Sequence, residues 1–338
     1  MNSDWKAFLE RHGGEPTGET REAQDCLLFD LSHLGLIRVS GEDARNFLQG
    51  QFTNDIRDVG SDHYQFSAYC TPKGRMLATL LVFEHDGDIH LQLPMATHQA
   101  VLQRLPLFVL MAKVQIEDAS DRLVRIGLAG PCAETLLQDA FPGLSLPGAP
   151  GEARQTPGIT LLRLPGDPPR FELIGETEAM IPLWERFADS AATGTPDRWA
   201  LLDIQAGIPV VQEGTIEAFV PQMANLQLIG GVSFTKGCYT GQEVVARMRY
   251  LGKLKRRMYL AHVETDQPPH PGDPVFSRTS QSGQGAGKVV DARPTPDGGY
   301  DLLVVAEIAL AEADDLHLLA EDGPILRLQS LPYPMEQA

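Results

Sequence analysis

The side chains best suited to chemistry in this chain gather around one cysteine, Cys238. Cys238 comes directly after Lys236 and Gly237 in the sequence, and a helix is expected to begin a few residues later. Thr240 and Glu243 have the spacing of a capping box, which places the start of that helix at Thr240. Unpaired N–H groups at a helix start, the helix dipole and the Lys236 ammonium all favour a thiolate over a thiol. The segment therefore predicts a reactive sulfur.

A plainer interpretation of Cys238 stays open beside this one. A lone cysteine in an intracellular protein is more often a small, buried apolar side chain than a nucleophile. Flanking glycines allow a backbone or a ligand to come close. The residues of the motif that would support a functional thiol are Lys236, Gly237, Tyr239, Gly241, Gln242 and Glu243.

The segment that follows the cysteine is strongly basic. The whole chain has a net charge of -17, which argues against a protein that coats nucleic acid. Six cations nevertheless form a basic stripe without an acidic residue among them, namely Arg247, Arg249, Lys253, Lys255, Arg256 and Arg257. Such a stripe is either a docking surface for a client protein or tRNA, or a solvated edge that improves solubility.

The composition indicates a globular protein in the cytoplasm. The chain has 338 residues, of which 43% are hydrophobic and 22% charged, enough for two or three domains. No apolar run is long enough to span a membrane, and residues 1–15 lack the pattern of a signal peptide. The four cysteines, at positions 26, 70, 132 and 238, show no CxxC pair. Their spacing argues against a zinc ion, any other metal ion or a complete iron–sulfur cluster held by this chain alone.

The segments before and after the motif predict an α+β fold. Alternating apolar residues indicate strands and hairpins in the first half, and Ser40 with Asp43 indicates a helix over 44–48. The strands are expected at 34–39, 64–69, 76–83, 89–93, 122–128, 159–164 and 171–174, with helices at 97–105 and 181–190. From residue 256 onward, short strands with turns at 297–299 and 321–323 predict a small β-barrel. The expected division is 1–120, 121–250 and 251–338.

A predicted helix before the motif carries a tryptophan. Thr195 can cap this helix, Pro196 suits its first turn, and Gly207 can end it. Trp199 lies on its apolar face, where simple core packing is the more common role of such a residue.

The chain resembles the YgfZ branch of the folate-binding, glycine-cleavage T-protein-like superfamily. The resemblance covers nearly the whole chain and rests on residues 28–55, 204–211, 219–234 and 236–243, the last reading KGCYTGQE. It implies two ferredoxin-like α+β units and a C-terminal β-barrel around a central channel that binds tetrahydrofolate. It also implies a role in assembly or repair of iron–sulfur clusters in a subset of enzymes, with an indirect effect on tRNA modification. Iron–sulfur client or assembly proteins would then be partners.

The resemblance also assigns roles to particular residues. Cys238 corresponds to the motif cysteine, and Trp199 to a tryptophan implicated in folate contact. Gln205 stands where the superfamily commonly has a glutamate, and Leu34 where some relatives have a tryptophan. Because an amide presents one acceptor where a carboxylate presents two, Gln205 predicts weaker folate binding.

Relatives that are aminomethyltransferases carry two aspartates where this chain has Ala78 and Thr79. Without a carboxylate there, no acid or base is positioned for one-carbon transfer. Aminomethyl transfer is therefore disfavoured, and no complete catalytic constellation is recognised. Whether the protein is an enzyme stays open, as does a purely structural adaptor role.

Overall fold

The computed structural model describes residues 2–12, 26–250, 254–279 and 285–335. The chain divides into two compact units, each built from separate stretches of sequence. Unit 1 comprises residues 1–47, 56–65 and 81–199, and unit 2 comprises residues 48–55, 66–80 and 200–338. The predicted three-part division at residues 120 and 250 stays a prediction. No helix among the described residues is long and apolar enough to cross a bilayer.

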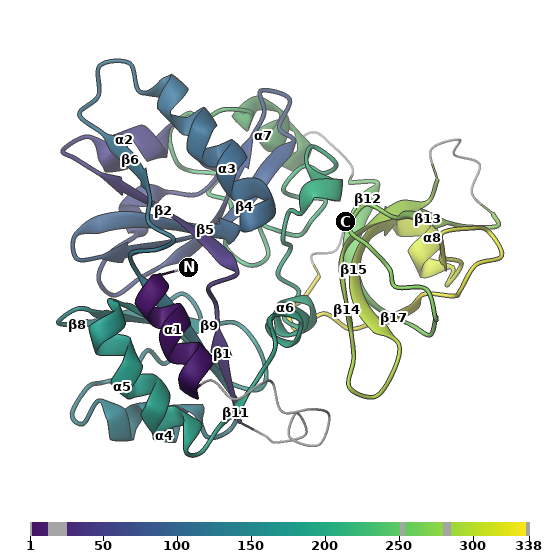
Figure 1. Ribbon diagram of the computed structural model, residues 1–338. Coiled ribbons are helices and arrows are strands. Elements are labelled where there is room, and N and C mark those ends of the chain that lie inside the picture. The colour runs from purple at the N-terminus through teal and green to yellow at the C-terminus, as the bar shows by residue number, and fades with distance from the viewer. Residues whose placement is uncertain (1, 13–25, 251–253, 280–284, 336–338) are drawn as a thin grey trace. The chain divides into compact units, whose positions relative to one another are not determined.

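Unit 1 contains a six-stranded sheet with strand order β11-β1-β7-β10-β9-β8. These strands are β1 (Leu27–Asp30), β7 (Val124–Ala129), β8 (Ala153–Thr156), β9 (Ile159–Leu164), β10 (Arg170–Gly175) and β11 (Ala192–Thr193). Strand β11 runs parallel to β1, and the other neighbours are antiparallel. The sheet is covered on one side by helices α1 (Ser3–His12), α4 (Ala133–Ala140) and α5 (Thr177–Ala188) (Figure 1).

The core of this part of unit 1 is aromatic. Trp5 and Phe8 lie one turn apart on α1, and Trp184 and Phe187 repeat that spacing on α5, as expected for helices that bury one face. The rings of Trp5 and Trp184 meet edge to face at 5.4 Å. The Trp5 indole N–H donates to Asp30 at 2.9 Å, so its polar atom is satisfied inside the core.

A second antiparallel group in unit 1 has strand order β4-β5-β2-β6. Its elements are β2 (Leu34–Ser40), β4 (Met76–His85), β5 (Asp88–Pro94), β6 (Gln115–Asp118), the helices α2 (Ala44–Gln49) and α3 (Met95–Arg104), and the 3-10 turns η1 (Ile56–Asp58) and η2 (Leu105–Phe108). Residues 81–85 of β4 pair with β5 in this unit. Helix α3 lies so close to β2 that a Cβ on Gly35 would meet the His98 ring at 2.5 Å. Only glycine fits at that contact.

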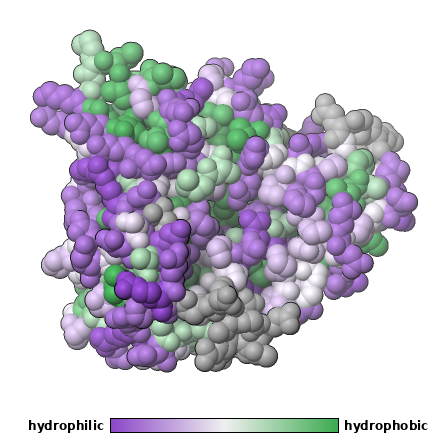
Figure 2. All heavy atoms as spheres, viewed as in Figure 1, coloured by the Kyte–Doolittle hydropathy of each residue, from purple (hydrophilic) through white to green (hydrophobic). Residues whose placement is uncertain are grey.

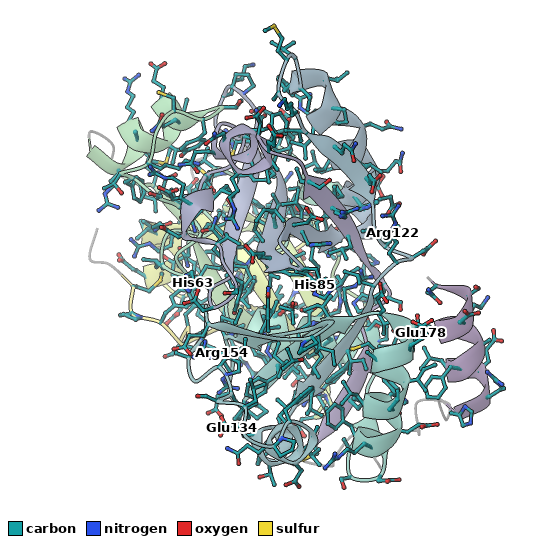
Figure 3. All side chains as sticks on the ribbon, turned by 90° about the vertical axis from the view of Figure 1, so that its left-hand side faces the viewer. His63, His85, Arg122, Glu134, Arg154 and Glu178 are labelled. Atoms are coloured by element: carbon teal, nitrogen blue, oxygen red, sulfur yellow. A yellow bond between two sulfur atoms is a disulfide. The ribbon has the colours of Figure 1, made fainter. Side chains whose placement is uncertain are left out.

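His85 and His90 are buried side by side in unit 1. The Nδ1 atom of His85, labelled in Figure 3, lies 2.8 Å from the Thr160 hydroxyl. His90 stacks on Phe83 and meets the His85 ring edge at 5.8 Å. Burial and the neighbouring His85 lower the pKa of His90 to about 4. Both rings are therefore held neutral at pH 7.

A group of apolar side chains stays at the surface of unit 1. Leu107 is 73% exposed, and Leu110 and Met111 are about as exposed as free side chains, at 89% and 94%. Figure 2 shows hydrophobic atoms gathered on the surface near α3. These side chains contribute little to the buried core.

Unit 2 contains a six-stranded half-barrel with strand order β16-β13-β14-β15-β12-β17. Its elements are β12 (Arg256–Val263), β13 (Pro274–Phe276), β14 (Gly287–Pro294), β15 (Tyr300–Glu307), α8 (Ile308–Glu312), β16 (His317–Leu318) and β17 (Arg327–Gln329). The strands alternate between two cores: Leu260 of β12 packs into one, and Ala261 into the other. The predicted turn at 297–299 joins β14 to β15, with positive φ at Gly298 and Gly299. The expected small barrel is thus a half-barrel.

The first face of the half-barrel packs against segments from elsewhere in unit 2. These are β3 (Gln65–Cys70), the first half of β4, the end of α6 (Pro196–Gln205) and α7 (Gln242–Tyr250); the 3-10 turn η3 (Glu213–Thr215) lies between α6 and α7 in sequence. Cys70 and Met76 share a buried cluster with Met258 and Val305 of the half-barrel. The mixed α and β content is confirmed. Ferredoxin-like units and a central channel stay predictions.

Candidate functional site

The motif cysteine lies at the surface of unit 2. Cys238 is exposed, whereas Cys70 is buried, and both carry free thiols. The interpretation of Cys238 as a buried apolar side chain is therefore wrong. The chemical role of its sulfur stays a prediction.

The described contacts of Lys236 are with a distant loop, and its expected effect on the Cys238 sulfur stays a prediction. Its side chain is buried, at 5% exposure, and its ammonium donates to the backbone oxygens of Gln49, Phe52 and Asn54 at 2.8, 2.7 and 2.7 Å. These bonds use all three N–H donors of the ammonium. Because hydrogen bonds to a charged group are stronger than neutral ones, Lys236 fixes the loop at 49–54.

Further hydrogen bonds join the same loop to the segment before the motif. Thr53 Oγ1 donates to the Gly231 oxygen at 2.7 Å, and Asn54 Nδ2 donates to the Gly230 oxygen at 2.6 Å. The Ser233 N–H donates to the Thr53 oxygen at 3.0 Å. Two stretches of the family resemblance, about 180 residues apart in sequence, therefore form one structure that supports Cys238.

Tyr239, the residue after the cysteine, has a buried side chain that lies against Lys236. The residue is 7% exposed, and Lys236 Nζ lies 5.1 Å from the centre of its ring. Burial, followed by the nearby Cys70, raises the pKa of the phenol above its ordinary value. The ring thus stays neutral and serves as an apolar and cation-binding face.

The start of α7 differs from the capping-box prediction. The helix begins at Gln242, and the Val245 N–H bonds to the Gly241 carbonyl, so Gly241 rather than Thr240 precedes the helix. Gly241 has φ +85, and a Cβ there would meet the Thr71 oxygen at 2.5 Å. The turn after β3 therefore packs directly against Gly241, and the positive φ of this glycine keeps it outside the helix that begins at the next residue.

The six cations of the basic stripe have different surroundings. Arg247, Arg249 and Lys255 are exposed, and the Arg249 guanidinium lies 3.9 Å from the centre of the Phe234 ring. Arg256 donates to Glu307 at 3.0 Å, and Arg257 is half-buried. Lys253 lies outside the described residues. Docking of a client or tRNA on this stripe stays a prediction.

The residues expected to contact folate lie in different units. In unit 1, Trp199 is 2% exposed, with Phe29 at 5.0 Å and the Arg170 guanidinium at 5.1 Å from its ring. Leu34, also in unit 1, is half-buried, and its carbonyl accepts from Arg125 at 2.8 Å. The described contacts of Trp199 fit its interpretation as a packed core residue; its stacking on folate stays a prediction.

Gln205, in unit 2, is the last residue of α6, and its Nε2 donates to Asp301 Oδ2 at 2.9 Å. The two positions that replace the aspartate pair are buried. Ala78 is fully buried, and Thr79 Oγ1 accepts from the Val211 N–H at 3.0 Å. Thr79 thus anchors the segment after α6, and neither side chain offers an acid.

Sequence reasoning missed one cross-link and one polar network. Cys26 and Cys132 form a disulfide in unit 1, with Cα atoms 5.9 Å apart and a sequence separation of 106. The network joins Gln205, Asp301 and His262. Local patterns carry no signal for either.

Among the described residues, no group of three or more His, Cys, Asp or Glu side chains is placed to hold a metal ion. The expected lack of a metal site stays a prediction.

Comparison with known proteins defines the class of this fold. The GCVT N-terminal domain matches residues 18–148. The crystal structure of glycine cleavage system aminomethyltransferase T from Bartonella henselae superposes with a TM-score of 0.70 at 18% identity, covering 93% of this chain and 88% of that one. The chain therefore has the aminomethyltransferase T fold.

Sequence relatives narrow the class further. The tRNA-modifying protein YgfZ of Colwellia psychrerythraea is 32% identical over 314 residues, covering 92% of this chain and 94% of the relative. The corresponding protein of Klebsiella pneumoniae is 30% identical over 311 residues, again with 92% and 94% coverage. This chain belongs to the YgfZ family of tRNA-modifying proteins.

Proposed function

We propose that this protein is a cytoplasmic, folate-binding accessory factor for the assembly or repair of iron–sulfur clusters in a subset of enzymes. Its effect on tRNA modification would be indirect, through client enzymes that need such clusters. Cys238 would be the functional group. The observation that carries the proposal is the exposed thiol at the centre of a motif that a buried lysine ties to a distant loop.

The surroundings of Cys238 support a functional rather than a structural thiol. Gly237 is exposed, and a Cβ there would meet no atom of the described residues within 4 Å, which leaves room for a partner next to Cys238. The site is rigid beneath the cysteine, because Lys236 and Tyr239 are both buried. A reactive group that is exposed on a fixed support suits transfer to, or ligation with, a partner protein.

The residues of unit 2 also fit a folate. Gln205 and Asp301 together offer amide and carboxylate oxygens, the acceptors that the N–H groups of a pterin require. Tetrahydrofolate, when bound, would supply a carrier for one-carbon groups. The part of the protein would be to bind and orient the pterin through these acceptors.

Aminomethyl transfer is the alternative that the fold itself favours. At 18% identity, the likeness to aminomethyltransferase T carries the fold alone. Ala78 has no polar side chain, and the Thr79 hydroxyl is engaged by a backbone N–H. With no carboxylate at either position, we expect no transfer of an aminomethyl group to tetrahydrofolate.

Two measurements test the proposal. Extracts of cells that lack the protein would be supplied with equal amounts of wild type or the Cys238→Ser variant, and the activity of a cluster-dependent enzyme measured. We expect recovery with wild type alone; equal recovery with Cys238→Ser would remove the sulfur from the function. Calorimetric titration with tetrahydrofolate should give saturable binding to wild type, and its absence would refute the folate part.

A further inference from the structure

The contacts of the buried carboxylate next to Gln205 indicate which of the two side chains binds the ligand. Asp301 lies near the start of β15, directly opposite His262 of β12 in the sheet register. Its Oδ2 accepts from Gln205 Nε2 at 2.9 Å, and its Oδ1 lies 2.9 Å from His262 Nδ1. A helix and a neighbouring strand thus hold the two carboxylate oxygens from different sides.

Asp301 and His262 are both largely buried and lie against each other. The Asp301 side chain is 8% exposed and that of His262 20% exposed. The hydrogen bond that His262 donates to Asp301 is the main reason that the pKa of His262 is raised, because the carboxylate favours the protonated ring. Arg293, the register partner of Asp301 on β14, donates instead to Asp291 at 2.5 Å. Asp301 is therefore held by an amide and an imidazole rather than by that guanidinium.

The orientation of the Gln205 amide follows from this contact. A carboxylate can only accept hydrogen bonds, so the amide must turn its NH2 group toward Asp301. That donor is then committed, and Gln205 keeps one acceptor oxygen. A ligand edge with two adjacent N–H donors cannot be satisfied by Gln205 alone.

Asp301 has the acceptor capacity that Gln205 lacks. An ionised carboxylate offers about four acceptor positions on its two oxygens. Gln205 and His262 occupy one position on each oxygen, which leaves one further position on each. A pair of parallel N–H donors matches two carboxylate oxygens, as in bidentate pairs of arginine with carboxylates.

We infer that Asp301 is the carboxylate that recognises the ligand in unit 2, and that Gln205 is its positioning residue. The ligand class is a planar heterocycle that presents a ring N–H beside an exocyclic amine, such as a 2-aminopyrimidinone ring. The inference rests on the folate part of the proposed function. It also explains why an amide at position 205 is compatible with such a ligand.

The neutral side chain of Gln205 supports the same assignment. A glutamate there would bring a second carboxylate to about the Gln205–Asp301 distance of 2.9 Å. Two carboxylates that close cannot both be ionised without a large penalty, so they would share a proton. With glutamine, Asp301 is the one side chain of the pair that can carry a negative charge.

Exchanging the carboxylate of Asp301 with the amide of Gln205 tests the assignment. Binding of tetrahydrofolate and of an analogue without the exocyclic 2-amino group would be measured by calorimetry. The proteins would be wild type, Asp301→Asn, the double variant Gln205→Glu/Asp301→Asn, and Asp297→Asn as a matched control in an exposed turn. We expect wild type and the control to prefer tetrahydrofolate at least 10-fold. Asp301→Asn should lose at least 10-fold in tetrahydrofolate affinity and most of that preference, and the double variant should recover both.

The outcomes separate this inference from the function on which it rests. If wild type binds neither compound, the folate proposal and this inference both fail. If wild type binds tetrahydrofolate but Asp301→Asn binds it equally well, only this inference fails. Equal affinity of wild type for the two compounds would also overturn it, and that comparison needs no variant to fold.

Discussion

Replacing Lys236 with methionine should destabilise unit 2, because the lysine satisfies three carbonyls that have to stay close together. The substitution leaves the oxygens of Gln49, Phe52 and Asn54 without this donor. An unsatisfied buried acceptor costs about 1–3 kcal/mol. We take the lower value, about 1 kcal/mol for each oxygen, because water can reach a loop and replace part of each hydrogen bond. The free energy of opening of unit 2 should then fall by about 3 kcal/mol.

The labelling rate of Cys70 measures this loss directly. Cys70 is 1% exposed in the unit 2 core, so a thiol reagent reaches it when the unit opens. Cys238→Ser would be included in every protein so that one free thiol is counted. A loss of 3 kcal/mol corresponds to about 100-fold faster labelling when opening is a rapid equilibrium. Lys255→Met, at an exposed lysine, is the matched control and should change the rate less than about 3-fold. A Lys236→Met protein that labels as slowly as this control would show that the three hydrogen bonds do not hold the loop.

Three further outcomes are expected. In native protein, iodoacetamide should modify Cys238 long before Cys70, because Cys70 is buried and its pKa is raised to about 12; faster labelling of Cys70 would contradict the burial. Reduction of the Cys26–Cys132 disulfide should lower stability by about 2–4 kcal/mol, and an unchanged melting temperature with dithiothreitol would refute this. The pKa of His90 is about 4 in the folded protein and about 6.5, its ordinary value, in the unfolded chain. Below pH 6.5 the unfolded chain therefore binds more protons than the folded protein. Stability should then fall by about 2 kcal/mol between pH 6.5 and pH 5, and the His90→Gln variant should lack this part of the decrease in calorimetric scans.

Much of the fold follows from local patterns in the sequence. The strand expected at 159–164 has the bounds of β9, and that expected at 34–39 ends one residue short of β2. Both segments have alternating or continuous apolar residues bounded by turn residues, and their burial agrees with that pattern. The helix expected at 181–190 begins earlier, as α5 starts at Thr177. Helix ends are less well defined than helix centres because competing caps lie close together in sequence.

The site was less predictable, because its contacts join distant parts of the chain. The carbonyls that bind Lys236 lie 182 to 187 residues away in sequence, and Gln205 bonds to Asp301 across 96 residues. A local sequence pattern could not show that the Lys236 ammonium binds the loop at 49–54. The capping box at Thr240 failed for the same reason, since the turn after β3 requires a glycine at position 241.

The measurement that tests the central claim most directly is the level of cluster-dependent tRNA modification in cells that lack this protein. These cells would express wild type, Cys238→Ser or Cys70→Ser to equal protein levels, and the modified nucleosides would be quantified by mass spectrometry. The exposed thiol should be essential and the buried one dispensable. We therefore predict recovery with wild type and Cys70→Ser and none with Cys238→Ser. Full recovery with Cys238→Ser would contradict a function that depends on this sulfur.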